Sequence, residues 1–174
     1  TGRLRLIRRA RGYETEIDAA RDVWQILMDR FGLSLAVFSG SLANIPRTGP
    51  LVVISNHPYG ILDGLVMAHV LSATRGDFRI LAHRVFRGSD ELDRVILPIN
   101  FDETREAIAQ NVETRKRTLG YLAQGGAVGI FPSGTVSTAA RPFGPAMDTG
   151  WRSFTARMIA RSDAAIVPIF FDGA

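Results

Sequence analysis

Short apolar runs alternate along this chain with segments in which apolar residues recur every three or four positions. The runs are typical of buried strands, and the recurring segments are typical of amphipathic helices. We expect strands at residues 35–38, 51–55, 78–82, 95–99, 127–131 and 165–171, and helices at residues 15–31, 63–71, 104–123 and 149–160. This alternation predicts one α/β domain with a mixed, largely parallel sheet flanked by helices and preceded by an N-terminal helical segment.

The 174 residues divide into a basic N-terminal segment with an amphipathic helix, residues 1–32, and an α/β domain, residues 33–174. Thr15 is the expected cap of the first helix and Gly32 its stop. Trp24 and Phe31 lie on its apolar face, which favours a core position over contact with a membrane. The chain begins without Met and ends directly after a strand-like run, so we expect a C-terminally truncated piece of a longer protein.

The net charge is +4, and five of the first eleven residues are arginines. Such a cluster suits nucleic acid, an anionic membrane surface or a solvated tail. No nucleic-acid-binding motif accompanies it, so we expect no nucleic-acid partner. The absence of cysteine excludes disulfides, thiolate zinc sites and a Cys nucleophile. No apolar stretch reaches the roughly 18 residues that span a bilayer, so any membrane contact is expected to be peripheral.

The segment Ser55-Asn-His-Pro-Tyr-Gly-Ile-Leu-Asp-Gly64 carries the strongest chemical signal. A buried strand ends there and a polar loop follows, which is where sites of α/β sheets gather. Pro58 and Gly60 interrupt any helix between His57 and Asp63. Asp63 can therefore face back to the imidazole, fix its tautomer and leave the other ring nitrogen free to take a proton. The alternative is a histidine that caps the next helix, and the spacing alone leaves both interpretations open.

Four ordered segments resemble the lysophospholipid and glycerophosphate acyltransferase family. Asn56-His57 with Asp63-Gly64 is similar to its first motif, and the five residues between His and Asp resemble the hemolysin-like or ornithine-lipid acyltransferase branch. Residues 42–50 (LANIPRTGP) are similar to the lead-in of the family. Phe131-Pro-Ser-Gly134 resembles the third motif, Phe-Pro-Glu-Gly, and Val167-Pro168 resembles the fourth. The resemblance spans residues 35–173.

The resemblance implies that the chain is an O-acyltransferase of phospholipid biosynthesis. A fatty acyl group would move from acyl-CoA or acyl carrier protein, as co-substrate, onto the hydroxyl of a lysophospholipid or lyso-ornithine-lipid type acceptor. His57 would be the general base and Asp63 its orienting partner. Backbone N–H groups near Gly60 or Gly134 are candidates for holding the oxyanion. The implied substrate-binding residues are Asn56, Gly60, Gly64, Arg84, Phe131, Pro132, Ser133 and Gly134.

No cofactor is implied, and no ligand spacing typical of a metal site is present. Arg79 and Arg141 are further candidates for a substrate anion. The location implied is cytoplasmic and peripheral on the inner face of an anionic membrane, with the N-terminal arginines and the amphipathic helix contributing to docking.

Two positions depart from the family pattern. Ser133 stands where many members carry Glu, and Thr135 where the hemolysin-like branch is expected to carry Glu. These departures keep a second interpretation open, a non-catalytic lipid-binding or acyl-chain-binding protein of the same fold. Ser133 is disfavoured as a nucleophile because the Gly-x-Ser-x-Gly pattern is missing.

Overall fold

The computed structural model describes residues 12–17, 22–83, 90–102, 104–139, 141, 144–151 and 153–173. Within them a five-stranded sheet has the order β3-β2-β4-β1-β7, and every pairing in it is parallel. Its strands are β1 (Leu51–Ser55), β2 (Arg79–His83), β3 (Ile96–Ile99), β4 (Ala127–Ile130) and β7 (Ala165–Ile169). A separate antiparallel hairpin consists of β5 (Thr138–Ala139) and β6 (Ala146–Met147). The predicted α/β class is confirmed.

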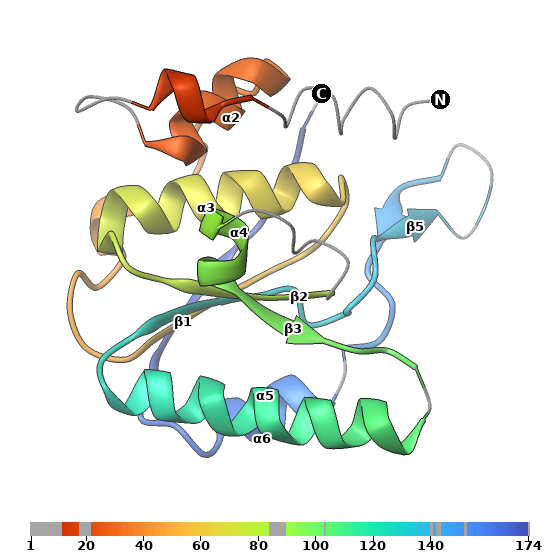
Figure 1. The fold of residues 1–174 in the computed structure, drawn as a ribbon. Coiled ribbons are helices and arrows are strands. Elements are labelled where there is room, and N and C mark those ends of the chain that lie inside the picture. Colours follow the sequence, from red (N-terminus) through yellow and green to blue (C-terminus); the bar gives the residue numbers. More distant parts are fainter. Residues whose placement is uncertain are drawn as a thin grey trace.

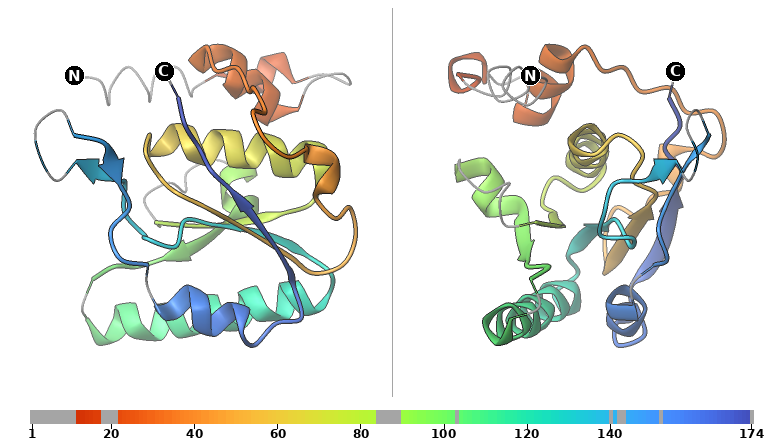
Figure 2. Two further views of the ribbon diagram at one scale, coloured as in Figure 1. Left: turned by 180° about the vertical axis from the view of Figure 1, so that it is seen from behind. Right: turned by 90° about the vertical axis from the view of Figure 1, so that its right-hand side faces the viewer.

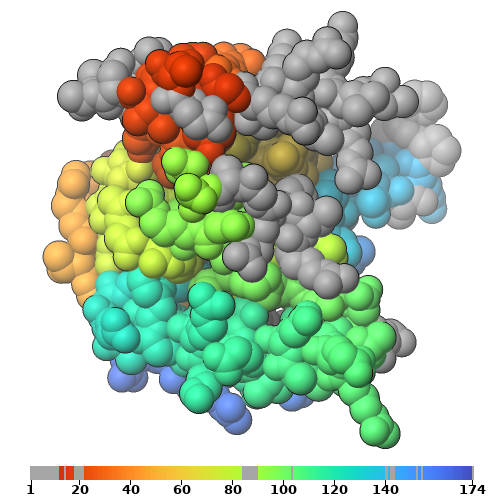
Figure 3. All heavy atoms as spheres, viewed as in Figure 1, coloured from red at the N-terminus to blue at the C-terminus, as the bar shows by residue number. Residues whose placement is uncertain are grey.

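Helices cover both faces of the sheet (Figures 1 and 2). One face carries α3 (Ile61–Arg75) and α4 (Asp90–Val95), with α2 (Val23–Phe31) packed outside α3. The other face carries α5 (Arg105–Ala123) and α6 (Ser153–Ile159). Figure 3 shows this stacking on one face of the molecule, with α2 at the top and α5 at the bottom.

Side chains that alternate along the strands build two cores. Leu51 and Val53 belong to the cluster under α3, whereas Val52 between them belongs to the cluster over α5. This division follows from the period of two in a strand, which sends successive side chains to opposite faces. β1 has strands on both sides and is buried almost throughout, as its unbroken apolar sequence predicts.

The first helix begins later than predicted. Asp22, not Thr15, caps α2, because its carboxylate accepts the N–H of Gln25 at 2.8 Å. Thr15 lies in a short 3₁₀ turn, Glu14–Glu16. The predicted stop is confirmed, since Gly32 takes the left-handed conformation with φ 66°. Trp24 and Phe31 are buried, which confirms that the apolar face of this helix is core and excludes it as a membrane-facing surface.

Two strand predictions need correction. Residues 35–38 form no strand, and Phe38 is 91% exposed. β1 already pairs with β4 and β7, so this segment runs over the surface as a connection instead. The last strand was expected to be buried, but β7 is at the edge of the sheet and its Ile166 is 48% exposed. The sequence pattern also missed α4 and the β5–β6 hairpin, which are too short and too polar to show a period.

The parallel arrangement places the carboxyl ends of all five strands at one edge of the sheet. The His57 loop follows β1 at this edge, and residues 131–135 follow β4 beside it. No helix in the described ranges is both long enough and apolar enough to cross a bilayer.

Candidate active site

The loop after β1 turns sharply at Gly60. This residue has φ 65° and ψ −120°, a conformation that is essentially restricted to glycine. The Gly60 carbonyl accepts the N–H of Asp63 at 3.1 Å and so begins α3. The turn places Asp63 in the first turn of the helix with its side chain directed at the preceding loop, as the sequence predicts.

His57 and Asp63 meet in this turn. His57 Nδ1 lies 3.0 Å from Oδ2 of Asp63, whose side chain is 3% exposed. The same Oδ2 accepts the N–H of Tyr59 at 2.8 Å. The distance between the ring nitrogen and the carboxylate is that of a hydrogen bond, yet the ring N–H is not aligned with any acceptor among the described residues. The 3.0 Å separation brings together the two side chains that the sequence pattern pairs.

The imidazole rests on the ring of Phe131, which follows β4. The two ring centroids are 4.1 Å apart and the rings are inclined by 26°. This stacking covers one face of the imidazole and leaves its side chain 18% exposed. Phe131 therefore contacts the His57 ring directly, whereas the resemblance assigned it to substrate binding.

The turn that contains the Phe-Pro-Ser-Gly motif is held by its own hydrogen bonds. Gly134 N–H donates to the Phe131 carbonyl at 3.0 Å, and Ser133 Oγ donates to the Thr135 carbonyl at 2.8 Å. Ser133 is 1% exposed. The Gly134 amide N–H is thus used within the turn, which disfavours it as a donor to an oxyanion. The buried Ser133 hydroxyl acts within the turn.

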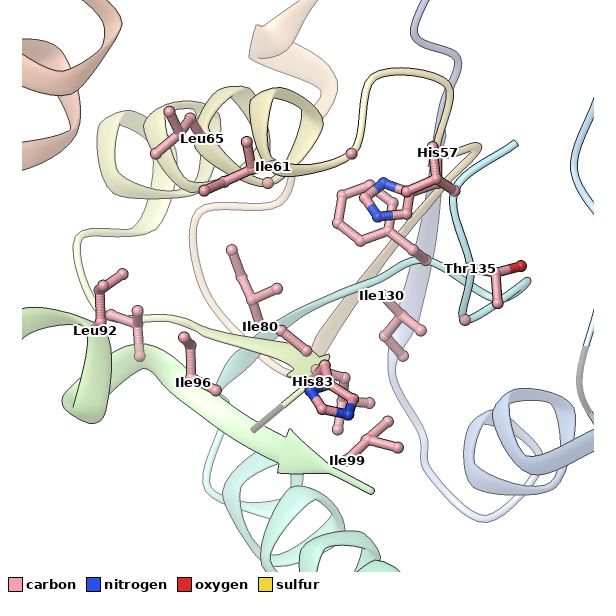
Figure 4. Close-up of a pocket in the computed structure, with 18 of the residues that line it drawn as sticks. His57, Ile61, Leu65, Ile80, His83, Leu92, Ile96, Ile99, Ile130 and Thr135 are labelled. Carbon is pink, nitrogen blue, oxygen red and sulfur yellow. The ribbon is translucent and has the colours of Figure 1, made fainter. Parts of the chain in front are cut away.

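An apolar cavity of about 660 Å³ opens beside His57 (Figure 4). α3 contributes Ile61 and Leu65, and the sheet contributes Ile80, Ile96 and Ile130. The cavity continues under α2, where Trp24, Leu27 and Phe31 line it. His83 also lines the cavity, with its ring stacked on Phe101 at 5.7 Å between centroids. A long apolar ligand therefore has space directly next to the histidine–carboxylate pair.

The structure brings most of the predicted site residues to this cavity. Its wall includes His57, Gly60, Gly64, Phe131, Pro132 and Gly134. Asn56 instead ties the His57 loop to the end of β7, since its side chain bonds both the N–H and the carbonyl of Phe171, at 2.7 and 2.8 Å. Arg84 lies outside the described residues.

The other two arginine candidates are not at the cavity wall. Arg79 pairs with Asp77 and lies over the ring of Tyr121, at the amino end of β2. Arg141 is exposed in the connection between β5 and β6. Within the described ranges, no three His, Asp or Glu side chains converge as metal ligands do.

Sequence reasoning missed Ser137 and Asp148, which contact the His57 main chain. The His57 N–H donates to Asp148 Oδ1 at 3.1 Å, and the His57 carbonyl accepts the Ser137 N–H at 2.8 Å. Both partners are 80 or more residues away along the chain, and no local pattern marks either of them.

Comparison with known proteins identifies the family of this chain. The Acyltransferase family model matches residues 37–172, so this chain belongs to the acyltransferase family. It is also similar to the lyso-glycine lipid O-acyltransferase of Phocaeicola vulgatus, with 26% identity over 133 residues. The aligned part is 76% of this chain and 45% of that protein, so the chain spans about half the length of its relative.

Proposed function

We propose that this chain is the catalytic domain of an O-acyltransferase that moves a fatty acyl group from a thioester donor onto the hydroxyl of a lyso-lipid. The observation that carries the proposal is the 3.0 Å contact between His57 Nδ1 and the buried Asp63 carboxylate, at the wall of an apolar cavity. Membership of the acyltransferase family and the name of the relative support the same reaction class.

His57 acts as the general base in this proposal. Its Nε2 takes the proton of the acceptor hydroxyl while the oxygen attacks the thioester carbonyl carbon. The new C–O bond forms, the C–S bond breaks, and the departing thiolate takes the proton back from the imidazolium. Asp63 stabilises the imidazolium by its charge and holds the ring orientation. Backbone N–H groups near Gly60 stabilise the oxyanion.

The two substrates differ in what they require of the site. The apolar cavity suits the acyl chain, because its aliphatic and aromatic lining offers few polar partners. The donor is acyl-CoA or acyl carrier protein, and acyl transfer from either donor needs no resident cofactor. The acceptor is a lyso-lipid with an amino-acid or phosphate headgroup, a class that includes the lyso-glycine lipid in the name of the relative.

Peripheral contact with an anionic membrane, on its inner face, completes the proposal. Tyr59, Val136 and Trp151 are large, exposed, and placed in loops around the His57 edge of the sheet. Aromatic and apolar side chains in such loops suit the membrane interface. Sedimentation with phosphatidylglycerol vesicles tests this contact, and a protein that stays in the supernatant at low salt contradicts it.

The experiment that tests the function is thiol release from palmitoyl-CoA and palmitoyl acyl carrier protein with a panel of lyso-lipids, on the full-length protein. Wild type and His57→Ala are compared. We expect acceptor-dependent release that falls by about 10²–10⁴ in the variant, the usual contribution of a general base. Far-ultraviolet circular dichroism of both proteins controls for folding. Equal rates in the two folded proteins would contradict the proposal.

A second candidate function is lipid binding without turnover. The turn that contains Phe-Pro-Ser-Gly favours this function. Ser133 is buried there and donates to the Thr135 carbonyl, and neither residue supplies the carboxylate that the family pattern has at these positions. Saturable binding of a lyso-lipid that His57→Ala leaves unchanged, together with no thiol release by wild type, would establish it.

A further inference from the structure

The main chain of His57 is held by a segment far away in the sequence. Its N–H donates to Asp148 Oδ1 at 3.1 Å and its carbonyl accepts the Ser137 N–H at 2.8 Å. The residue lies in a loop between β1 and α3, where neither a sheet ladder nor a helix supplies these bonds. Both polar groups of the His57 main chain are therefore satisfied by residues outside its own loop.

Ser137 and Asp148 flank the β5–β6 hairpin. The antiparallel register pairs Thr138 with Met147 and Ala139 with Ala146, so one further step places Ser137 opposite Asp148. The Ser137 hydroxyl donates to Asp148 Oδ1, which closes this end of the hairpin. The strands of this hairpin are two residues long, and their open end contacts the loop that carries His57.

The Asp148 carboxylate uses both oxygens. Oδ1 accepts from the His57 N–H and from the Ser137 hydroxyl, and Oδ2 accepts from the Trp151 indole N–H at 3.2 Å. One acceptor oxygen thus holds both the His57 backbone and the Ser137 side chain, so the position of Oδ1 fixes the position of the two donors. The carboxylate meets the His57 backbone and not its ring, so it takes no part in proton transfer.

We propose that Asp148 is a positioning residue for His57, acting through the main-chain N–H together with Ser137 at the end of the β5–β6 hairpin. The inference rests on the proposed function of His57 as the base. Asp63 and Phe131 orient the ring, whereas Asp148 fixes the backbone from which the ring extends. A shift of this backbone would move Nε2 away from the hydroxyl, and displacements near 1 Å cost roughly 10²-fold in rate.

The test compares Asp148→Ala and Asp148→Asn in the full-length protein. Asn keeps a carbonyl oxygen for the His57 N–H and the Ser137 hydroxyl, whereas Ala keeps no acceptor. With palmitoyl-CoA and a lyso-glycine lipid we expect kcat of the Ala variant to fall by roughly 10²-fold with KM within about twofold. The Asn variant is expected to retain kcat within about threefold. Asp163→Ala, which removes an exposed carboxylate before β7, is the matched control.

Hydrogen exchange of the His57 amide, followed by NMR, is the readout that needs no turnover. We expect slow exchange in wild type and in Asp148→Asn, and at least tenfold faster exchange in Asp148→Ala. If Asp148→Ala fails to fold, exchange of the His57 amide in the wild type still tests the proposal, because rapid exchange contradicts the hydrogen bond to Asp148.

The outcomes separate this inference from the proposed function. Slow exchange of the His57 amide with no turnover in any of the proteins would support the contact with Asp148 and reject His57 as a general base. An active enzyme whose kcat and His57 exchange are both unchanged by Asp148→Ala would overturn the inference and leave the base intact. Equal losses of kcat in the Asn and Ala variants would also overturn it, since the shared loss is then charge and not the acceptor oxygen.

Discussion

At the scale of single residues, the site depends on a few backbone positions that only certain residue types can occupy. Gly60 has φ 65° and ψ −120°, and this conformation returns the chain so that Asp63 faces His57. A Cβ at Gly60 would also lie 3.3 Å from Cγ2 of Val136. Backbone strain and crowding therefore act on the same position.

Gly60→Ala is expected to destabilise the protein by about 1–3 kcal/mol, the cost of holding a non-glycine residue in such a region. The measurement is the free energy of unfolding from urea titration. Gly64→Ala is the matched control, because Gly64 lies in α3 with no atom within 4 Å of its added Cβ. A helical alanine is favoured over glycine by roughly 1 kcal/mol, so this variant is expected to gain stability. Equal effects at the two positions would contradict the role of the turn.

At the scale of elements, a polar contact joins the start of β2 to the end of α5. The Tyr121 hydroxyl donates to Asp77 Oδ2 at 2.9 Å, and the Arg79 guanidinium lies 4.6 Å from the Tyr121 ring centroid. Burial and this hydrogen bond raise the pKa of Tyr121 to about 12. Burial raises the pKa of Asp77 as well, but the hydrogen bonds that its carboxylate accepts from Arg79 and Tyr121 outweigh burial, so the pKa of Asp77 is lowered overall.

The raised pKa of Tyr121 predicts a loss of stability in alkali. The folded-state pKa lies above the ordinary value of 10.0, so the contribution is complete below that pH and is lost as the pH rises through about 12. Urea midpoints measured across this window should fall more steeply for wild type than for Tyr121→Phe. Tyr59→Phe keeps the Asp77 contact and should follow wild type. Parallel curves for wild type and Tyr121→Phe would refute the assignment.

At the scale of the whole molecule, the cavity exists because α2 and α3 lie over the sheet without filling the space beside His57. The same elements that build the core therefore shape the acyl site of the proposed function. Ile80 of β2 projects into this space (Figure 4), and it is 6% exposed.

Ile80→Phe is expected to shorten the acyl chain that the cavity accepts. The ratio of kcat/KM for palmitoyl-CoA to that for octanoyl-CoA should fall by roughly tenfold, within the range that small changes in an apolar pocket produce. The cost in stability is about 1–3 kcal/mol, measured by urea unfolding. Ile166→Phe adds the same volume on the exposed edge strand β7 and should leave the ratio unchanged. An unaltered ratio in Ile80→Phe would show that the acyl chain does not bind in this cavity.

The sequence alone determined the local features of this protein. Short, mostly apolar runs predicted β1, β2 and β4, a buried helical segment predicted the middle of α3, and a long helix with a polar face predicted α5, because these patterns depend on neighbours along the chain. The pairing of His57 with Asp63 was likewise accessible, since Pro58 and Gly60 lie between them and the turn is local.

Only the tertiary structure decided which residues distant in the sequence contact His57. Asp148 contacts a residue 91 positions away, and Phe131 reaches His57 because β4 lies beside β1. The exposure of Ile166 depends on the strand order, which leaves β7 at an edge. These contacts arise from the packing of separate elements, and their free energy does not depend on sequence neighbours, so no local pattern records them.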